Sequence, residues 1–341
     1  MKKIYYLLCL AFLAVSAIFV GGCGSSDDTG AKTVALAMPN SSDSWKRNGE
    51  AIKQALEREG FVVMLEFADT AEQQNDHIKK MIESKPKCIV IGAVDSIKLA
   101  DVLKKAKEEK IPIIAYDRLI MQSDAISYYV TFDNEAVGAA MGEYLEAALN
   151  LKTGAGPFNI EFFGGDPADN NAHLFFSGAM KVLQPYLDSK QLVCPSGETT
   201  FEKVNTKDWK PENATVRMEK LLDGPDAGLQ LDAILSPNDG VAGGIIAALN
   251  NKGYSGNWPL ITGQDCDPNA IKMIQEGKQA MTISKPPATL SAKCVRMIKS
   301  VVEGTEPDIN DITTYNNGVL TVPSYLCTPR IINIENIAAA K

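Results

Sequence analysis

Residues Cys88–Ala93 read Cys-Ile-Val-Ile-Gly-Ala and are followed by Val94 and Asp95. The run is apolar, rich in β-branched residues and no longer than a strand. Similar runs occupy 33–38, 61–68 and 111–116, and amphipathic stretches at 45–58, 72–84 and 95–110 separate them. Strands that are apolar throughout and alternate with helices indicate a parallel sheet covered on both faces. The sequence therefore predicts an α/β fold.

The same alternation starts again after residue 134. It predicts strands at 158–165, 191–195, 233–236, 259–262 and 281–284, and helices over 134–150, 172–187, 211–222, 240–251 and 288–302. A final apolar strand is predicted over 319–326. Each half is long enough for its own sheet, so we predict two doubly wound parallel-sheet lobes.

Composition narrows the class of protein. The chain has 341 residues, of which 45% are hydrophobic and 22% charged, as in soluble globular proteins. Acidic residues outnumber basic ones by 42 to 34, and the net charge of −8 argues against a nucleic-acid partner. With two histidines and no Cys-x-x-Cys pair, we expect neither a metal nor a cofactor.

The first 23 residues predict export. Lys2 and Lys3 precede an uncharged apolar run over 4–20, which ends in Val20-Gly21-Gly22-Cys23. A basic start followed by an apolar run is typical of a secretory signal, here residues 1–22. Small residues before a cysteine resemble the lipobox of bacterial lipoprotein precursors, which implies a lipid on Cys23 and a flexible tether over 23–31.

The alternative is an uncleaved transmembrane anchor, although the run is close to the minimum length for a span. Cleavage would remove Lys2 and Lys3 and take the net charge to −10. We therefore predict a lipoprotein held through Cys23 at the outer face of the cytoplasmic membrane, or on the periplasmic side. Besides Cys23, five cysteines remain after cleavage, and we expect most of them to be buried apolar side chains: Cys88, Cys194, Cys266, Cys294 and Cys327.

Polar side chains follow the predicted strands, where parallel sheets bind their ligands. In the first half they are Asp95, Asp117, Arg118, Asp133 and Asn134; in the second they are Asp169, Asn170, Asn171, Asn238, Asp239, Gln264, Asp265 and Lys285. Carboxylates accept hydrogen bonds, arginine and lysine donate them and amides do both, so the set suits a neutral polyhydroxylated ligand. Any single member, such as Asp95 or Asn134, also suits a helix cap.

Sugars also need an apolar partner for their C–H faces, and two tryptophans outside core-like runs are candidates. Trp45 follows Ser-Asp-Ser, and Trp209 lies between Asp208 and Lys210. Each has a structural alternative: Trp45 packing on the neighbouring strand, and Trp209 stapling the start of the next helix. We predict one tryptophan in each lobe of the site.

Enzyme motifs are absent from the sequence. It contains no Gly-x-Ser-x-Gly, Gly-x-x-x-x-Gly-Lys, Gly-x-Gly-x-x-Gly or His-Glu-x-x-His pattern. A glycosidase remains an alternative, because Asp117, Asp133, Asp239 and Asp265 could converge. Neighbouring cations and amides favour the ionised form of these carboxylates, so we expect them to hold a sugar and not to protonate it.

Several segments, taken together, resemble the type I periplasmic sugar-binding proteins, and within them the xylose-binding and multiple-sugar-binding receptors of ABC transporters. They are Ile-Ala-Tyr-Asp117-Arg118-Leu-Ile, Thr-Phe-Asp133-Asn134, Phe-Gly-Gly-Asp-Pro-Ala-Asp169-Asn170-Asn171-Ala, Trp209-Lys-Pro-Glu-Asn-Ala, Ser-Pro-Asn238-Asp239-Gly, Gly-Gln264-Asp265, Ser-Lys285-Pro and residues 317–326. They run from residue 33 to the C-terminus in the order found in that family.

The resemblance implies two lobes joined by a three-segment hinge, with a monosaccharide such as xylose, glucose, galactose or arabinose held between them and delivered to an ABC permease. We assign 32–134 and 266–285 to the N-terminal lobe, and 135–265 and 286–341 to the C-terminal lobe. No residue is assigned a catalytic role. By the same resemblance the sugar-binding residues are Trp45, Asp117, Arg118, Asn170 or Asn171, Trp209, Asp239, Gln264, Asp265 and Lys285.

One departure leaves the sugar open: relatives tend to have a basic residue before the first tryptophan, whereas Ser44 precedes Trp45 here. A receptor that signals to a chemoreceptor or sensor kinase would share the fold and differ in its partner. A related transcriptional regulator would need a helix-turn-helix before Thr33, where the export signal lies instead.

Overall fold

The computed structural model describes residues 32–40 and 43–340. The predicted signal, the tether and Cys23 lie outside these residues. Over the described ranges, none of the helices combines the length and the apolar composition needed to cross a membrane. Two parallel sheets, each with helices on both faces, confirm the predicted α/β class.

The first sheet has six parallel strands in the order β11-β5-β4-β3-β1-β2. Their bounds are β1 (Thr33–Pro39), β2 (Val62–Ala68), β3 (Cys88–Ile91), β4 (Ile113–Tyr116), β5 (Ile126–Phe132) and β11 (Ser324–Cys327). Every residue of β3 and β4 is buried, because both faces of these central strands are covered by helices.

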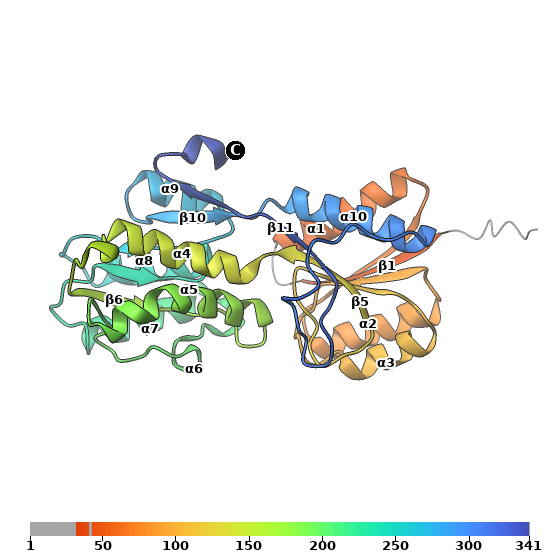
Figure 1. Cartoon of the computed structure of the whole chain (residues 1–341), viewed down its shortest axis with the longest axis horizontal. Helices are drawn as coiled ribbons and strands as arrows, with labels where there is room; N and C mark the ends of the chain where they lie inside the picture. The colour runs from red at the N-terminus through yellow and green to blue at the C-terminus, as the bar shows by residue number, and fades with distance from the viewer. Residues whose placement is uncertain (1–31, 41–42, 341) are drawn as a thin grey trace, which may run out of the picture. The chain divides into compact units, whose positions relative to one another are not determined.

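Figure 1 shows α1 (Asp43–Arg58) and α10 (Pro287–Glu303) on one face of this sheet, and α2 (Ala71–Glu83) and α3 (Ala100–Glu108) on the other. Successive side chains of each strand point to opposite faces of the sheet. Leu36 packs with residues of α1 and α10, whereas Ala35 packs with residues of α2 and α3.

The second sheet has the parallel order β7-β6-β8-β9, with β6 (Phe158–Phe162), β7 (Leu192–Val193), β8 (Ala233–Leu235) and β9 (Leu260–Ile261). β10 (Met281–Ser284) lies beside β9, since Ala280 donates its N–H to the carbonyl of Ile261 at 2.9 Å. β12 (Arg330–Asn333) pairs antiparallel with β10.

Helices α4 (Asn134–Ala148) and α5 (Asn170–Asp188) cover one face of the second sheet, and α7 (Pro211–Asp223) and α8 (Asp239–Asn251) cover the other. The shorter helices are α6 (Phe201–Val204), α9 (Pro268–Gln275), and the 3₁₀ turns η1 (Leu151–Thr153), η2 (Lys207–Trp209) and η3 (Ile337–Ala340).

The chain passes between the sheets three times: between β5 and α4, between β10 and α10, and between β11 and β12. Residues 266–285 lie with the second sheet, and α10 and β11 lie with the first, which is the reverse of the predicted division. Met281 and Ile283 join the core of the second half, whereas Leu290 and Cys294 join that of the first. Of residues 286–341, only those from β12 onward lie in the lobe predicted for them.

The five cysteines of the described part are free. Cys88, Cys294 and Cys327 are buried, as predicted, and Cys194 and Cys266 are half-buried. Burial raises the pKa of the Cys194 thiol to about 11 and that of Cys327 to the same value, so these thiols are protonated at neutral pH.

Candidate functional site

Trp45 lies in the first turn of α1, close to the loop that follows β3. Its indole is 9% exposed and meets the ring of Tyr116 edge to face, with centroids 6.1 Å apart. A Cβ atom on Gly92 would lie only 2.6 Å from the indole, so the close approach of this ring needs glycine. The packing role that the sequence allowed for Trp45 is therefore present.

Asp117 directly follows β4 in the left-handed conformation, with a φ of 62°. Its carbonyl oxygen accepts hydrogen bonds from Tyr129 Oη at 2.7 Å, Thr131 Oγ1 at 3.0 Å and Asn171 Nδ2 at 2.8 Å. Three donors on one carbonyl fix this turn. Burial raises the pKa of the Asp117 carboxyl, and the positive charge of Lys285 opposes that rise.

Arg118 is 9% exposed, and its guanidinium has several partners, among them the Val94 carbonyl, which accepts from Nη1 at 3.4 Å. Nε lies 3.0 Å from Oδ2 of Asp169, and Nη1 donates to the carbonyl of Ala93 at 3.0 Å. The guanidinium carbon lies 5.3 Å from the ring centre of Trp45, a cation–π contact. The structure thus brings Trp45, Asp117 and Arg118 together, as predicted, and adds Asp169, which the predicted site did not include.

The two asparagines at the start of α5 differ in their surroundings. Asn171 is 3% exposed, and besides its bond to Asp117 it accepts a hydrogen bond from Tyr129 Oη at 3.4 Å. Asn170 is half-buried, and its backbone N–H donates to Ser96 Oγ at 3.3 Å. Among the described residues none hydrogen-bonds the Asn170 side chain, which leaves its amide available to a ligand.

Trp209 ends the 3₁₀ turn η2 and is half-buried. Its ring meets Phe175 edge to face, with centroids 6.5 Å apart. A Cβ atom on Gly165 would lie 2.0 Å from the indole, so this second tryptophan also rests on a glycine that follows a strand. The indole Nε1 is buried and has no hydrogen-bond partner among the described residues, so it is an unused donor at the site.

Lys285 and Asp265 form a pair at the ends of β10 and β9. Lys285 Nζ lies 3.5 Å from Asp265 Oδ1 and 5.0 Å from the ring centre of Phe175. Asn238, the N-cap of α8, donates from Nδ2 to Asp265 Oδ2 at 3.4 Å. The predicted site lacked Asn238 and Phe175. The strand-end pattern included Asn238, but the predicted site contained its neighbour Asp239 instead.

Asp239, the aspartate of the predicted site, has other partners than Lys285 and Asn238. It is 6% exposed, and its carboxylate accepts hydrogen bonds from Asp267 N at 2.9 Å, Gln279 Nε2 at 2.8 Å and Thr282 Oγ1 at 2.9 Å. Burial, helped by the negative charge of Asp265, raises the pKa of Asp239 to about 8, against the effect of these donors. These bonds tie β10 and the loop after β9 to α8, and the contact of Asp239 with a ligand stays a prediction.

Gln264 is 1% exposed, and its backbone carbonyl accepts the N–H of Asp239 at 2.9 Å. Its side-chain Oε1 is buried and has no hydrogen-bond partner among the described residues. A buried acceptor without a donor is costly, so a bound hydroxyl or water would stabilise this position. Gln264 is therefore a candidate acceptor for a hydroxyl of the ligand.

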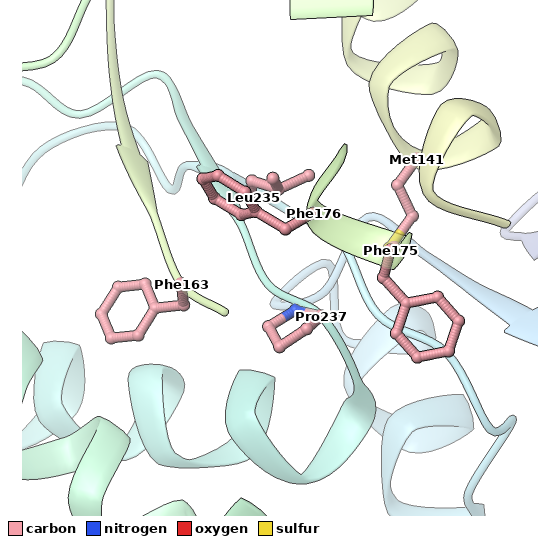
Figure 2. A pocket seen from close by; sticks show the side chains of 6 residues that line it. All are labelled: Met141, Phe163, Phe175, Phe176, Leu235 and Pro237. Carbon is pink, nitrogen blue, oxygen red and sulfur yellow. The ribbon is translucent and has the colours of Figure 1, made fainter. Parts of the chain in front are cut away.

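An apolar space lies behind this part of the site. Figure 2 shows its lining, which is Met141, Phe163, Phe175, Phe176, Leu235 and Pro237. The space has no room for a water molecule. It is therefore a packing region that supports Phe175 and the Pro237–Asn238 turn, and the polar strand ends form the candidate site.

The arrangement can bind a neutral polar ligand. Asp117, Asp169 and Asp265 lie among the cations Arg118 and Lys285, and amides and indole faces lie beside them. Charged acceptors and donors can hydrogen-bond the hydroxyl groups of such a ligand. The aromatic rings beside them can pack against its C–H faces. The fold and the site thus define a ligand-binding protein of two sheets with polar groups at the strand ends of each.

Comparison with known proteins agrees with that class. Residues 34–306 match the family described as "Periplasmic binding protein domain", and the chain belongs to this family. Proteins of this family bind solutes and are not enzymes, so the glycosidase alternative is set aside. The predicted family is confirmed.

Three similar proteins cover most of the chain. The multiple sugar-binding periplasmic receptor ChvE of Rhizobium radiobacter is 40% identical over 98% of this chain and 95% of its own. The D-xylose-binding periplasmic protein of Escherichia coli is 36% identical over 86% and 84%. The crystal structure of an ABC transporter solute binding protein from Clostridium phytofermentans with bound β-D-glucose is 43% identical over 90% and 96%, with a TM-score of 0.87.

Proposed function

We propose that this protein captures a monosaccharide, with xylose, glucose, galactose and arabinose as the candidates, and delivers it to an ABC importer. The observation that carries the proposal is the set of donors and acceptors around Asp265. Lys285 and Asn238 contact its carboxylate, and the ring of Phe175 lies under the ammonium group. A neutral polyol is bound by charged and amide groups that hydrogen-bond its hydroxyls and by aromatic rings that pack against its C–H faces.

The names of the relatives support the ligand class. One is described as a multiple sugar-binding receptor, one as D-xylose-binding, and one solved structure holds β-D-glucose. The last is described as an ABC transporter solute binding protein, which supports a permease as the partner. Because one relative is called a receptor, a sensor partner is the second candidate. Co-purification from membranes with permease subunits, and not with a sensor, is the expected result.

We also propose that a lipid on Cys23 anchors the protein to the membrane. The sequence before it resembles a lipobox, and residues 24–30 are a polar Gly-Ser-Asp-rich tether. Mass spectrometry of the mature N-terminal peptide should find a diacylated Cys23, and Cys23→Ser should release the protein from membranes. An unmodified Cys23 within an uncleaved chain would favour the transmembrane alternative.

Calorimetric titration of ligand-stripped protein against xylose, arabinose, glucose, galactose and ribose tests the central claim. We expect at least one sugar to bind at micromolar concentration or tighter. Lys285→Met should weaken binding at least about tenfold, because it removes a charged donor from a nearly buried position. The control is Lys272→Met, which removes an exposed lysine paired with Glu276 and should leave binding unchanged. No binding below millimolar concentration would refute the proposed function.

A further inference from the structure

The start of α5 contacts the first half of the molecule, although the helix belongs to the second sheet. Ser96 donates its N–H to the carbonyl of Ala168 at 3.2 Å, and Asn170 donates its N–H to Ser96 Oγ at 3.3 Å. Asn171 Nδ2 donates to the carbonyl of Asp117 at 2.8 Å. Residues 168–171 therefore touch the loops that follow β3 and β4.

An ion pair accompanies these neutral contacts. Asp169 Oδ2 lies 3.0 Å from Arg118 Nε, and the two side chains are 6% and 11% exposed. The other described partners of the guanidinium are the carbonyls of Ala93 and Val94 and the Trp45 ring, and all of them belong to the first half. A buried charge that loses its partner is strongly destabilised. Separation of the two halves would therefore break the costliest contact at Asp169.

We infer that Asp169 is a positioning residue that holds Arg118 in the ligand site, and that their ion pair is a latch that slows release of the ligand. The ion pair fixes the guanidinium from the second half while Trp45 and Ala93 fix it from the first. A ligand leaves only after the halves part, so the latch adds to the barrier for dissociation. This inference rests on the proposed function for its kinetic part.

The test uses Asp169→Asn, which keeps the helix cap and removes the charge. Asp169 Oδ1 accepts the N–H of Asn171 at 2.9 Å, and asparagine caps helices as well as aspartate does. Asp133→Asn is the matched control: Asp133 caps α4 through the N–H of Ala136 at 3.0 Å and has no ion pair among the described residues.

Stopped-flow tryptophan fluorescence with D-glucose and D-xylose measures the kinetic effect. In Asp169→Asn the dissociation rate should rise about tenfold or more while the association rate changes by less than about threefold, because the loss of one partner of a buried charge pair acts on release. Asp133→Asn should match the wild type. In the double variant with Arg118→Gln, removing Asp169 should add little further effect. An unchanged dissociation rate would overturn the positioning role.

Amide hydrogen exchange of the ligand-free protein tests the latch without any sugar. Exchange at Ser96 and Asn170, whose N–H groups bond across the two halves, should speed up several-fold in Asp169→Asn and stay unchanged in Asp133→Asn. Equal exchange in wild type and Asp169→Asn overturns the latch, whatever the sugar kinetics show. If the wild type binds no sugar, the proposed function fails, and the exchange rates still decide the latch.

Discussion

The indole of Trp209 lies 2.0 Å from the place where a Cβ atom on Gly165 would be. No real side chain fits at that distance, so the ring rests directly on the backbone after β6. The same relationship holds in the other half, where Trp45 rests on Gly92 at 2.6 Å. Both candidate aromatic groups are therefore positioned by glycines at strand ends.

Gly165→Ala should displace Trp209. The new methyl group cannot coexist with the indole, and the ring is the part that can move because Trp209 is half-buried and ends an irregular turn. We expect sugar affinity to fall about tenfold, with a shift in tryptophan fluorescence and only a small change in melting temperature. Calorimetry and fluorescence measure the three quantities.

Gly240→Ala is the control for that substitution. Gly240 lies next to the site at the start of α8, but the nearest atoms to an added Cβ are 3.7 Å away, an ordinary contact. This variant should bind as the wild type does. If Gly165→Ala also binds normally, the ring of Trp209 takes no part in recognition.

Asn238 performs two tasks that different substitutions separate. Oδ1 accepts the N–H of Val241 at 2.9 Å as the cap of α8, and Nδ2 contacts Asp265. Asn238→Asp keeps the cap and loses the amide donor, whereas Asn238→Ala loses both. Sugar affinity should fall in both variants, since each lacks the donor.

Only Asn238→Ala should also lose stability, by about 1 kcal/mol, which is the usual cost of losing a helix cap. Denaturant unfolding of the two variants beside calorimetry makes the comparison. Normal sugar binding by Asn238→Asp would show that the amide takes no part in the site.

The alternation of strands and helices predicted the two sheets because strand and helix periods are local properties of the chain. The sheet to which a late segment belongs is not local. Met281 and Ile283 alternate with two small polar residues in a short buried strand, and nothing in that local sequence tells which sheet the strand joins. Pairing of β10 with β12, which come nearly fifty residues apart, decides it.

The candidate site was predictable to the level of segments. Polar groups do follow β4, β8, β9 and β10, as predicted from the sequence. Which of two adjacent residues faces the site, however, depends on the direction of its side chain. Asn238 and Asp239 are adjacent, and the start of α8 turns Asp239 inward to Gln279 and Thr282 while Asn238 stays beside Asp265. Asp169 belonged to the strand-end pattern but not to the predicted site, because its partner Arg118 lies 51 positions away in the chain.

Helices α4 and α5 touch backbone to backbone through two glycines. A Cβ on Gly138 would lie 2.0 Å from the carbonyl oxygen of Phe175, and one on Gly178 would lie 2.1 Å from that of Glu135. Gly178→Ala should therefore lower the free energy of unfolding by about 1–3 kcal/mol, because neither backbone can yield.

Gly243→Ala, in α8 with no atom within 4 Å of the added Cβ, should instead raise that free energy by up to about 1 kcal/mol, the gain of alanine over glycine in a helix. Denaturant unfolding gives both values. If both alanine variants stabilise the protein, the close crossing of α4 and α5 is wrong.

Asp226 and Glu161 are acids buried together, away from the candidate site. Glu161 is fully buried in β6, and Asp226, in the turn after α7, is 1% exposed. Within the described residues no donor reaches either carboxylate oxygen of Asp226. Burial and the negative charge of Glu161 raise the pKa of Asp226 to about 7, although Arg217 opposes the rise.

Stability should therefore depend on pH in a definite direction. The folded state holds the Asp226 proton up to about pH 7, whereas the unfolded chain releases it near its ordinary pKa of 3.8, so the free energy of unfolding falls as pH rises between these values. Asp226→Asn cannot ionise, and its amide can donate to Glu161. Its gain in unfolding free energy over the wild type should be greater at pH 8 than at pH 5 by roughly 2 kcal/mol.

Asp223→Asn is the control, because Asp223 is exposed in the same region and paired with Lys252 at 2.6 Å. Its small effect should not grow with pH, since an exposed ion pair contributes little to stability. Urea unfolding of the three proteins at both pH values gives the comparison. A gain for Asp226→Asn that is equal at pH 5 and pH 8 would mean that folding does not raise the pKa of Asp226.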